Sequence, residues 1–451
     1  MSYRNKDWSF AELSRKETLW GPHGYHRYPA KFIPHLVRRI IDEFSLPGEV
    51  IGDIFLGSGT TGVEAIRTGR QFYGSDINPV ACLISRAKCF PIDPSILNET
   101  WKDVSRIISQ IAPLGRNPLT DKDKEAILSI NISYALPEER LQYWFPESQR
   151  QALTAILKAI LSVPIEQHRI FMLCAFSNIL KRCSIWLSGS TKAQKDLKKT
   201  LADPVDEFLK QVRDMMKRNK LYWEDLLTNG INPQQAGEQI RILQQDARSL
   251  DTETPQVDLL VTSPPYATCY EYSELHQLTQ LWFEKFGIIS AVEAKQNWIG
   301  SKNVSSGTLN KGVFPHTGSE SADTTLRELL HLANQRPTKK TDIIREARAL
   351  HRYFIDMNRA ICEMTRIVPT GKQLVLIIGD SRKRDVDIPT TQALCEMSSS
   401  AGFALQEKIN RKVPGRVLVS TRDRETGKFS STANSDVEVY PEENVLVFKR
   451  V

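Results

Sequence analysis

The chain has 451 residues, of which 41% are hydrophobic and 25% are charged, a composition typical of soluble globular proteins. This length predicts two or three domains, or one domain with large insertions. The formal net charge of +7 mildly favours a polyanionic partner, although many basic proteins bind no nucleic acid.

The seven cysteines are dispersed and form no CxxC pair. This pattern fits a reducing cytosol and argues against a disulfide framework or a zinc site. The N-terminus is polar and predicts no signal peptide. No apolar run reaches about 18 residues, so we expect no membrane span. The sequence therefore predicts a cytoplasmic protein that holds no metal.

The N-terminal part of the chain carries one predicted helix and then a strand–helix repeat. Apolar residues recur at helical spacing over 33–44. Residues 50–92 follow as strand, glycine turn, helix, strand and helix. Residues 93–238 have no clear strands, and their apolar periodicity predicts helices at 150–163, 168–183 and 203–227.

Strands return in the second half of the chain, at 239–262. Residues 288–340 are polar and rich in Gly, Ser and Thr, and we interpret them as a long, partly mobile loop. The remaining predicted elements are a helix at 342–367, a strand at 372–381, a helix at 390–401 and strands at 402–413 and 444–451.

Helices thus alternate with apolar strands, which is the signature of a doubly wound, mostly parallel, Rossmann-like α/β sheet. We predict that residues 1–92 and 239–451 form the two halves of this domain. Residues 93–238 would then be a large helical insertion.

A glycine turn lies between the first strand of the repeat and its helix. The sequence Gly57–Gly62 reads G-x-G-x-x-G in the required strand–turn–helix context, and Asp76 stands at the end of the next strand. Glycines let the backbone approach a ligand, and an acid at that place suits a ribose hydroxyl pair. The alternative is a tight turn beside an ordinary surface acid. The pattern predicts a nucleoside-type cofactor and leaves open a dinucleotide or S-adenosylmethionine.

The segment Ser263–Tyr266, Ser-Pro-Pro-Tyr, directly follows a buried strand. Such a position projects into the ligand crevice of an open parallel sheet. The prolines stiffen the backbone and donate no N–H, so Ser263 and the carbonyl near Pro264 are fixed acceptors and Tyr266 offers a flat face. This set suits a planar heterocycle with an exocyclic amine, whose nitrogen would attack a methyl sulfonium in line. The alternative is a turn that merely ends a strand.

These motifs together resemble the S-adenosylmethionine-dependent DNA amino-methyltransferases, which modify cytosine N4 or adenine N6. The family's FxGxG motif resembles Phe55–Gly59, its acidic motifs match Asp76 and Asp246, and its catalytic motif matches Ser263–Tyr266. Residues 26–34 resemble the segment that closes over the cofactor's methionine end in these enzymes. The similarity covers residues 20–92, 239–286 and 341–451.

The resemblance implies S-adenosylmethionine as cofactor and double-stranded DNA as substrate, and it assigns roles to individual residues. The implied catalytic residues are Ser263, Pro264, Pro265 and Tyr266. The implied cofactor-binding residues are Tyr28, Pro29, Lys31, Phe32, Asp53, Phe55, Gly57, Ser58, Gly59, Thr60, Thr61, Asp76, Ile77, Asn78, Asp246, Ala247 and Thr262.

Serine at position 263 resembles the cytosine-N4 members more than the adenine-N6 members, so cytosine N4 is the expected target. The base would leave the duplex to reach the pocket. Residues 181–220 hold eleven Lys and Arg against five Asp and Glu, which suits phosphate contacts, although a solvated helix face is the alternative. The candidate DNA-binding residues are Lys181, Arg182, Lys192, Lys195, Lys198, Lys199, Arg411, Lys412 and Arg416.

Three rival functions remain open at this point. An RNA amino-methyltransferase would use a similar pocket, a nicotinamide dehydrogenase would use the glycine turn, and a silent subunit would only bind DNA. The family resemblance implies a bacterial or archaeal restriction–modification or defence setting. A separate restriction endonuclease or defence-system protein is therefore an expected partner.

Overall fold

A computed structural model describes most of the chain. It covers residues 8–28, 31–111, 139–190, 193–267, 272–290, 298–301, 314–384, 386–413, 421–422, 437–438 and 442–451. Within these ranges, no helix combines the length and the apolar character that crossing a membrane requires.

A seven-stranded sheet forms the centre of the molecule, in the order β3-β2-β1-β4-β5-β11-β8. All neighbouring strands from β3 to β5 are parallel, and β11 is antiparallel to both β5 and β8. The mostly parallel, doubly wound sheet is therefore confirmed. The strands are β1 (Val50–Asp53), β2 (Gln71–Asp76), β3 (Ile240–Gln244), β4 (Leu259–Thr262), β5 (Gln373–Ile378), β8 (Phe403–Lys412) and β11 (Glu442–Arg450).

Four short strands pair outside the central sheet. One two-stranded sheet joins β6 to β7 and the other joins β9 to β10. They are β6 (Ser381–Lys383), β7 (Val386–Ile388), β9 (Thr421–Arg422) and β10 (Val437–Glu438).

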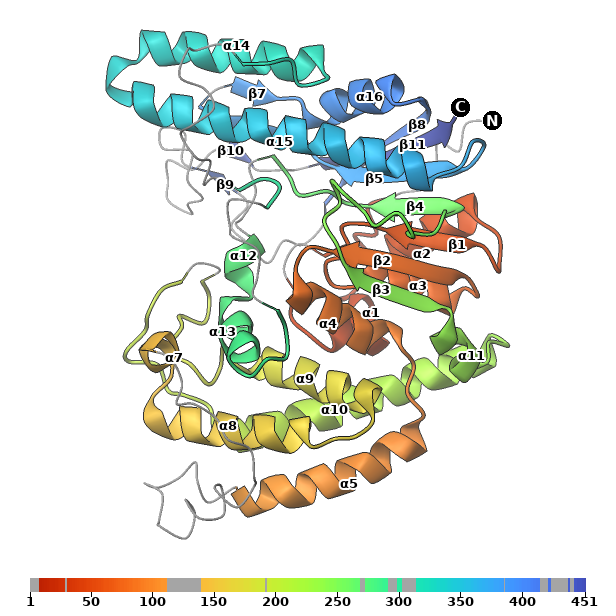
Figure 1. The fold of residues 1–451 in the computed structure, drawn as a ribbon, viewed down its shortest axis with the longest axis vertical. Helices are drawn as coiled ribbons and strands as arrows, with labels where there is room; N and C mark the ends of the chain where they lie inside the picture. The colour runs from red at the N-terminus through yellow and green to blue at the C-terminus, as the bar shows by residue number, and fades with distance from the viewer. Residues whose placement is uncertain are drawn as a thin grey trace.

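Both faces of the central sheet are buried because apolar side chains alternate along its strands. Leu259 and Val261 of β4 pack in the core that contains α2 (Pro34–Phe44) and α3 (Thr60–Arg67). Leu260 packs in the opposite core. That second core is built with α14 (Glu320–Gln335), α15 (Lys340–Ile367) and α16 (Thr390–Ser400), which cover the sheet in Figure 1.

The strand order reverses beside β1, because β2 lies on one side of it and β4 on the other. In open parallel sheets, ligands bind outside the carboxyl ends of the strands at such a point. The glycine turn follows β1 and the Ser-Pro-Pro-Tyr segment follows β4. The topology therefore places both motifs at the same edge of the sheet.

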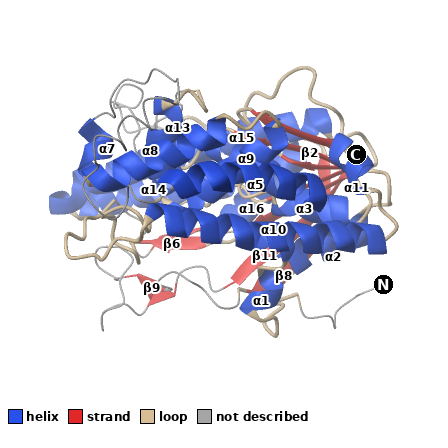
Figure 2. Cartoon of the chain, turned by 90° about the horizontal axis from the view of Figure 1, so that it is seen from below, coloured by secondary structure: helices blue, strands red, loops and turns tan. Residues whose placement is uncertain are grey.

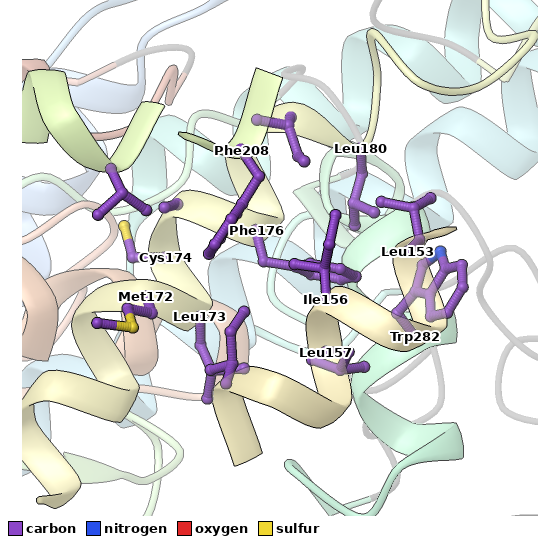
Figure 3. Packing of buried hydrophobic residues seen from close by; sticks show 14 of the residues in the cluster. Leu153, Ile156, Leu157, Met172, Leu173, Cys174, Phe176, Leu180, Phe208 and Trp282 are labelled. Carbon is purple, nitrogen blue, oxygen red and sulfur yellow. The ribbon is translucent and has the colours of Figure 1, made fainter. Parts of the chain in front are cut away.

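A layer of helices lies beside the sheet, and helices predominate in the molecule as a whole (Figure 2). Buried residues of this layer form one core with Trp282, which comes from the segment after Tyr266 (Figure 3). The layer thus packs directly on the sheet domain, while its separate domain status stays a prediction. Its helices are α5 (Pro94–Ile111), α7 (Glu139–Trp144), α8 (Glu147–Leu161), α9 (Glu166–Ile179), α10 (Pro204–Thr228), α12 (Tyr272–Leu275) and α13 (Gln277–Lys285).

The other helices connect these parts. They are α1 (Arg15–Thr18), η1 (Gly21–Gly24), α4 (Pro79–Cys89), α11 (Pro233–Glu238) and η5 (Pro337–Lys339).

The predicted loop at 288–340 is wrong over its second half. Residues 320–335 form α14, whose N-terminus is capped by the Ser319 side chain accepting from the Ala322 N–H. Ala322, Leu326 and Leu329 are buried at helical spacing. The polar composition of the segment concealed this periodicity, because the exposed face of an amphipathic helix is itself polar. Residues 291–297 and 302–313 lie outside the described ranges.

Candidate active site

The glycine loop is held by steric limits that only glycine meets. Gly59 caps α3 in a left-handed conformation with φ of 75°, and a Cβ built there would lie 2.8 Å from Ser85 Oγ. The helix begins without a side-chain cap, so its first N–H groups are directed toward a ligand. The side chains of Ser58, Thr60 and Thr61 are buried. A cofactor would therefore meet the backbone of this loop.

Asp53 joins the glycine loop to the strand that carries the Ser-Pro-Pro-Tyr segment. Its carboxylate accepts from Thr262 Oγ1 at 2.6 Å and from Thr61 Oγ1 at 2.7 Å. The Phe55 N–H donates to the same carboxylate at 3.1 Å. Burial raises the pKa of Asp53 to about 7, against the hydrogen bonds that lower it. Asp53 and Thr262 were predicted as cofactor contacts, and they are bonded to each other.

Asp76 lies beside the glycine loop, as the sequence predicted. One carboxylate oxygen accepts from the Gly57 N–H at 2.8 Å and the other from the Asn78 N–H at 2.9 Å. Burial raises the pKa of Asp76 to about 6. Each oxygen keeps a further lone pair for a ribose hydroxyl. Asn78 is buried and caps α4, and Ile77 is half-buried.

The segment ahead of α2 reaches the glycine loop through one aromatic ring. A Cβ built on Gly57 would lie 3.7 Å from Tyr28 Cε1, so Tyr28 covers the loop. Phe32 packs on the sheet core that includes α2 and α3. Lys31 is turned elsewhere, because its ammonium donates to the His23 carbonyl at 2.8 Å. Pro29 lies outside the described residues.

Asp246 follows β3 and is engaged by a neighbouring arginine. Arg248 Nη2 lies 2.5 Å from Asp246 Oδ2, and Arg248 also bonds Asp356 at 3.0 Å. Ala247 is buried in the core. The Asp246 side chain is 31% exposed, so a ligand has access to it while Arg248 fixes its orientation.

Ser263 and Tyr266 are half-buried and each makes one defined hydrogen bond. Ser263 Oγ donates to the Ile377 carbonyl of β5 at 2.9 Å. Tyr266 donates its phenol hydrogen to Glu443 Oε2 of β11 at 2.8 Å. Pro264 is buried and Pro265 is half-buried. The structure therefore fixes both polar groups at the strand edge, beside the glycine loop.

The partner of Tyr266 belongs to a network that the sequence did not reveal. Glu443 accepts from Arg411 Nη1 on its other oxygen. Arg411 also donates to the carbonyls of Trp8 and Ser9, at 2.7 and 3.1 Å. The prediction that Arg411 contacts DNA is wrong, because its side chain is only 2% exposed and committed to these partners.

The basic run of the helical layer is divided between structural and accessible lysines. Lys199 donates to the carbonyls of Lys181, Ser184 and Trp186, at 2.6 to 2.9 Å, so its predicted DNA contact is replaced by a structural one. Lys195 and Lys198 are exposed, as is Lys412. Arg182 is 49% exposed and pairs with Glu207. Lys192 and Arg416 lie outside the described residues.

The geometry fits S-adenosylmethionine, because an acid, free helix N–H groups and a covering aromatic ring meet at one loop. Among the described residues, no group of three or more His, Cys, Asp or Glu side chains is arranged to hold a metal ion.

Comparison with known proteins gives a consistent result. A family model described as DNA methylase matches residues 2–87. The type II methyltransferase M.MvaI of Kocuria varians is 24% identical over 448 residues, which is 96% of this chain and 93% of that protein. M.BsoBI of Geobacillus stearothermophilus is 26% identical, over 57% of this chain and 51% of its own. M.MjaII of Methanocaldococcus jannaschii is 39% identical, over 22% and 19%.

The DNA methylase match spans the glycine loop and Asp76, and the similarity to M.MvaI runs over nearly the whole chain. Both agree with a sheet edge built to hold a nucleoside cofactor beside an amine acceptor site. The chain belongs to the DNA amino-methyltransferases, which transfer a methyl group from S-adenosylmethionine to an exocyclic amine of a base in DNA.

Proposed function

We propose that this enzyme methylates the N4 amine of cytosine, held at Ser263–Tyr266. The observation that carries the proposal is the hydrogen bond from Ser263 Oγ to the Ile377 carbonyl. Because the hydroxyl hydrogen is committed to that carbonyl, the Ser263 lone pairs are left as acceptors. A neutral acceptor fixed in this way suits an amine that must donate a hydrogen and expose its own lone pair.

The chain's own residues perform the positioning in this scheme. The target amine donates to Ser263 Oγ and to the carbonyl near Pro264, which draws the nitrogen out of conjugation with the ring. Tyr266 presents its face to the base, and Glu443 fixes the phenol so that the ring does not turn. Bound S-adenosylmethionine supplies the methyl group as a sulfonium. Orientation and fixed dipoles then carry the rate.

For the cofactor, we infer that Asp76 holds the ribose hydroxyls and that Asp246 accepts from the adenine amine. Both carboxylates are accessible, and each is held by donors of the protein. The loop Gly57–Thr61 would contribute backbone N–H groups, and Tyr28 would cover the site. The relatives are named type II methyltransferases, so the proposal includes a restriction–modification setting with a separate endonuclease.

The proposal is tested by incubating the protein with labelled S-adenosylmethionine and duplex DNA, and by identifying the methylated nucleoside after digestion. We expect N4-methylcytosine. N6-methyladenine would overturn the choice of base and leave the family intact. Genome sequencing of a host that carries the gene, by a method that reports the modified base, would give the recognition site.

Two variants test the catalytic assignment. Ser263→Ala removes the acceptor, and by analogy with loss of one fixed polar group we expect transfer to fall about 10²- to 10³-fold. Tyr266→Ala should fall similarly, while both variants keep cofactor affinity. Ser95→Ala, at an exposed serine bonded only to Asp93, is the matched control. Parental transfer rates in Ser263→Ala would show that the assignment is wrong.

A further inference from the structure

A polar cavity of about 200 Å³ lies between the sheet domain and the helical layer. Its walls come from the loop ahead of α2 (His26 and Arg27), the end of α9 and the start of α13 (His276 and Thr279). Figure 1 shows α12 and α13 beside α9. Since α12 and α13 are the segment that follows Tyr266, this cavity adjoins the chain that leaves the catalytic motif.

Positive charge gathers at this cavity. Arg27, Lys181 and Arg182 all line it, and Arg182 alone of them has a carboxylate partner within the described ranges, Glu207 at 2.9 Å. Lys181 donates to the Ser190 carbonyl at 2.5 Å. Its pKa is lowered to about 8, first by burial and then by the charges of Arg27 and Lys199. An anion in the cavity would relieve this repulsion.

The inner wall contains an unused polar group. His276 is 5% exposed, and its Nε2 has no hydrogen-bond partner in the described part of the chain. Buried polar atoms are rarely left without a partner. The neighbouring groups are already bonded to each other, because Ser177 Oγ lies 2.9 Å from His26 Nε2 and 2.8 Å from Thr279 Oγ1. The free ring nitrogen therefore marks a position that a ligand completes.

The same histidine connects the cavity to the cofactor loop. The rings of His276 and Tyr28 lie 4.8 Å apart between centroids, and Tyr28 covers Gly57. Arg27 immediately precedes Tyr28 in the chain. A ligand in the cavity would therefore lie one aromatic ring away from the residues that hold the methyl donor.

We propose that this cavity binds a backbone phosphate of the target DNA strand near the extruded base, through Arg27 and Lys181, with His276 as a further donor. The inference rests on the proposed function, because it names how that DNA is held. A phosphodiester is preferred over a neutral ligand because the cations are in excess and arranged around a cavity with a polar inner wall. Phosphate contacts fix the register of an enzyme on the duplex without reading sequence.

The test combines charge removal on both sides of the contact. Arg27→Gln and Lys181→Gln each remove one cation, and Lys220→Gln removes a 64% exposed lysine of α10 as the matched control. Duplexes carry the recognition site with a neutral methylphosphonate at one backbone position at a time, around the target base. Binding is measured by fluorescence anisotropy over a salt series, and cofactor affinity by calorimetry confirms that each variant is folded.

For the parent and Lys220→Gln, we expect one methylphosphonate position to weaken binding about tenfold. Arg27→Gln and Lys181→Gln should bind the natural duplex about tenfold more weakly and lose little more at that position. Their salt dependence should fall by about 0.9 per lost contact. If every methylphosphonate weakens these variants as much as the parent, the cavity holds no phosphate. A parent that transfers no methyl group to DNA would instead refute the proposed function.

Discussion

The sheet edge and the basic run of the helical layer were both predicted from side-chain type, and they differ in how their side chains are used. At the sheet edge, Asp76 and Ser263 lie at strand ends, where the backbone limits them to one edge. In the basic run, Lys199 is bound by three carbonyls while Lys198, one residue earlier, is exposed. Strand ends fix the position of a short side chain, whereas a lysine's long side chain is free to find a partner of its own.

The largest effect is expected where the sheet edge depends on a buried charge pair. Arg411→Met would leave Glu443 with its buried charge unpaired, and we expect a loss of about 3 to 5 kcal/mol in unfolding free energy. Arg411→Met with Glu443→Gln should recover part of it. Urea unfolding of the three proteins measures this. A loss below about 1 kcal/mol, as for a surface pair, would contradict the network described for Tyr266.

A pH dependence of stability is expected from Asp53 at the same edge. The native state keeps its proton up to about pH 7, whereas the unfolded chain releases it near pH 3.8. The native state therefore binds more protons between these values, and the Asp53 contribution to stability falls as pH rises through this window. The fall is of order about 4 kcal/mol at most.

Comparison of the parent with Asp53→Asn isolates this effect. The difference in their unfolding free energies should change between pH 4.5 and 7.5 in the sense that the parent loses stability relative to the variant. Asp103→Asn, at an aspartate that is 74% exposed, is the control. A difference that stays constant across this range would show that Asp53 titrates as an ordinary carboxyl group.

The glycine loop gives the next effect. Gly59→Ala forces a left-handed alanine whose Cβ would lie within 3 Å of the Ser85 side chain, and we expect a loss of about 3 kcal/mol. Cofactor binding should weaken as well. Gly189→Ala, where the added Cβ meets nothing within 4 Å, should be nearly neutral. Equal melting temperatures for the two variants would argue against the tight loop.

The elements with strong periodicity were predictable, and the long-range partners were not. Apolar spacing placed β4, α15 and the glycine turn correctly, because these signals are local in the sequence. Glu443 lies 177 residues after Tyr266, and only the pairing of β11 with β5 brings it there. The same holds for Arg411. In α14, composition outweighed a visible helical period, which is why the loop prediction failed.

The smallest effects separate the two kinds of lysine. Lys199→Met removes an ammonium that bonds three carbonyls, so we expect a loss of about 2 kcal/mol in stability. Lys198→Met should change stability by less than about 0.5 kcal/mol, because its side chain is exposed. If it contacts a phosphate, DNA binding should weaken and lose salt dependence.

The two variants, measured by urea unfolding and by DNA titration, should therefore show opposite patterns. Lys199→Met would be less stable, with a salt dependence close to the parent's once folded. Lys198→Met would be stable with a reduced one. Because the two lysines are neighbours in the chain, a shared pattern would mean that the local charge, rather than the place each ammonium occupies in the fold, decides its role. That result would remove the distinction between strand-end and charge-run predictions drawn above.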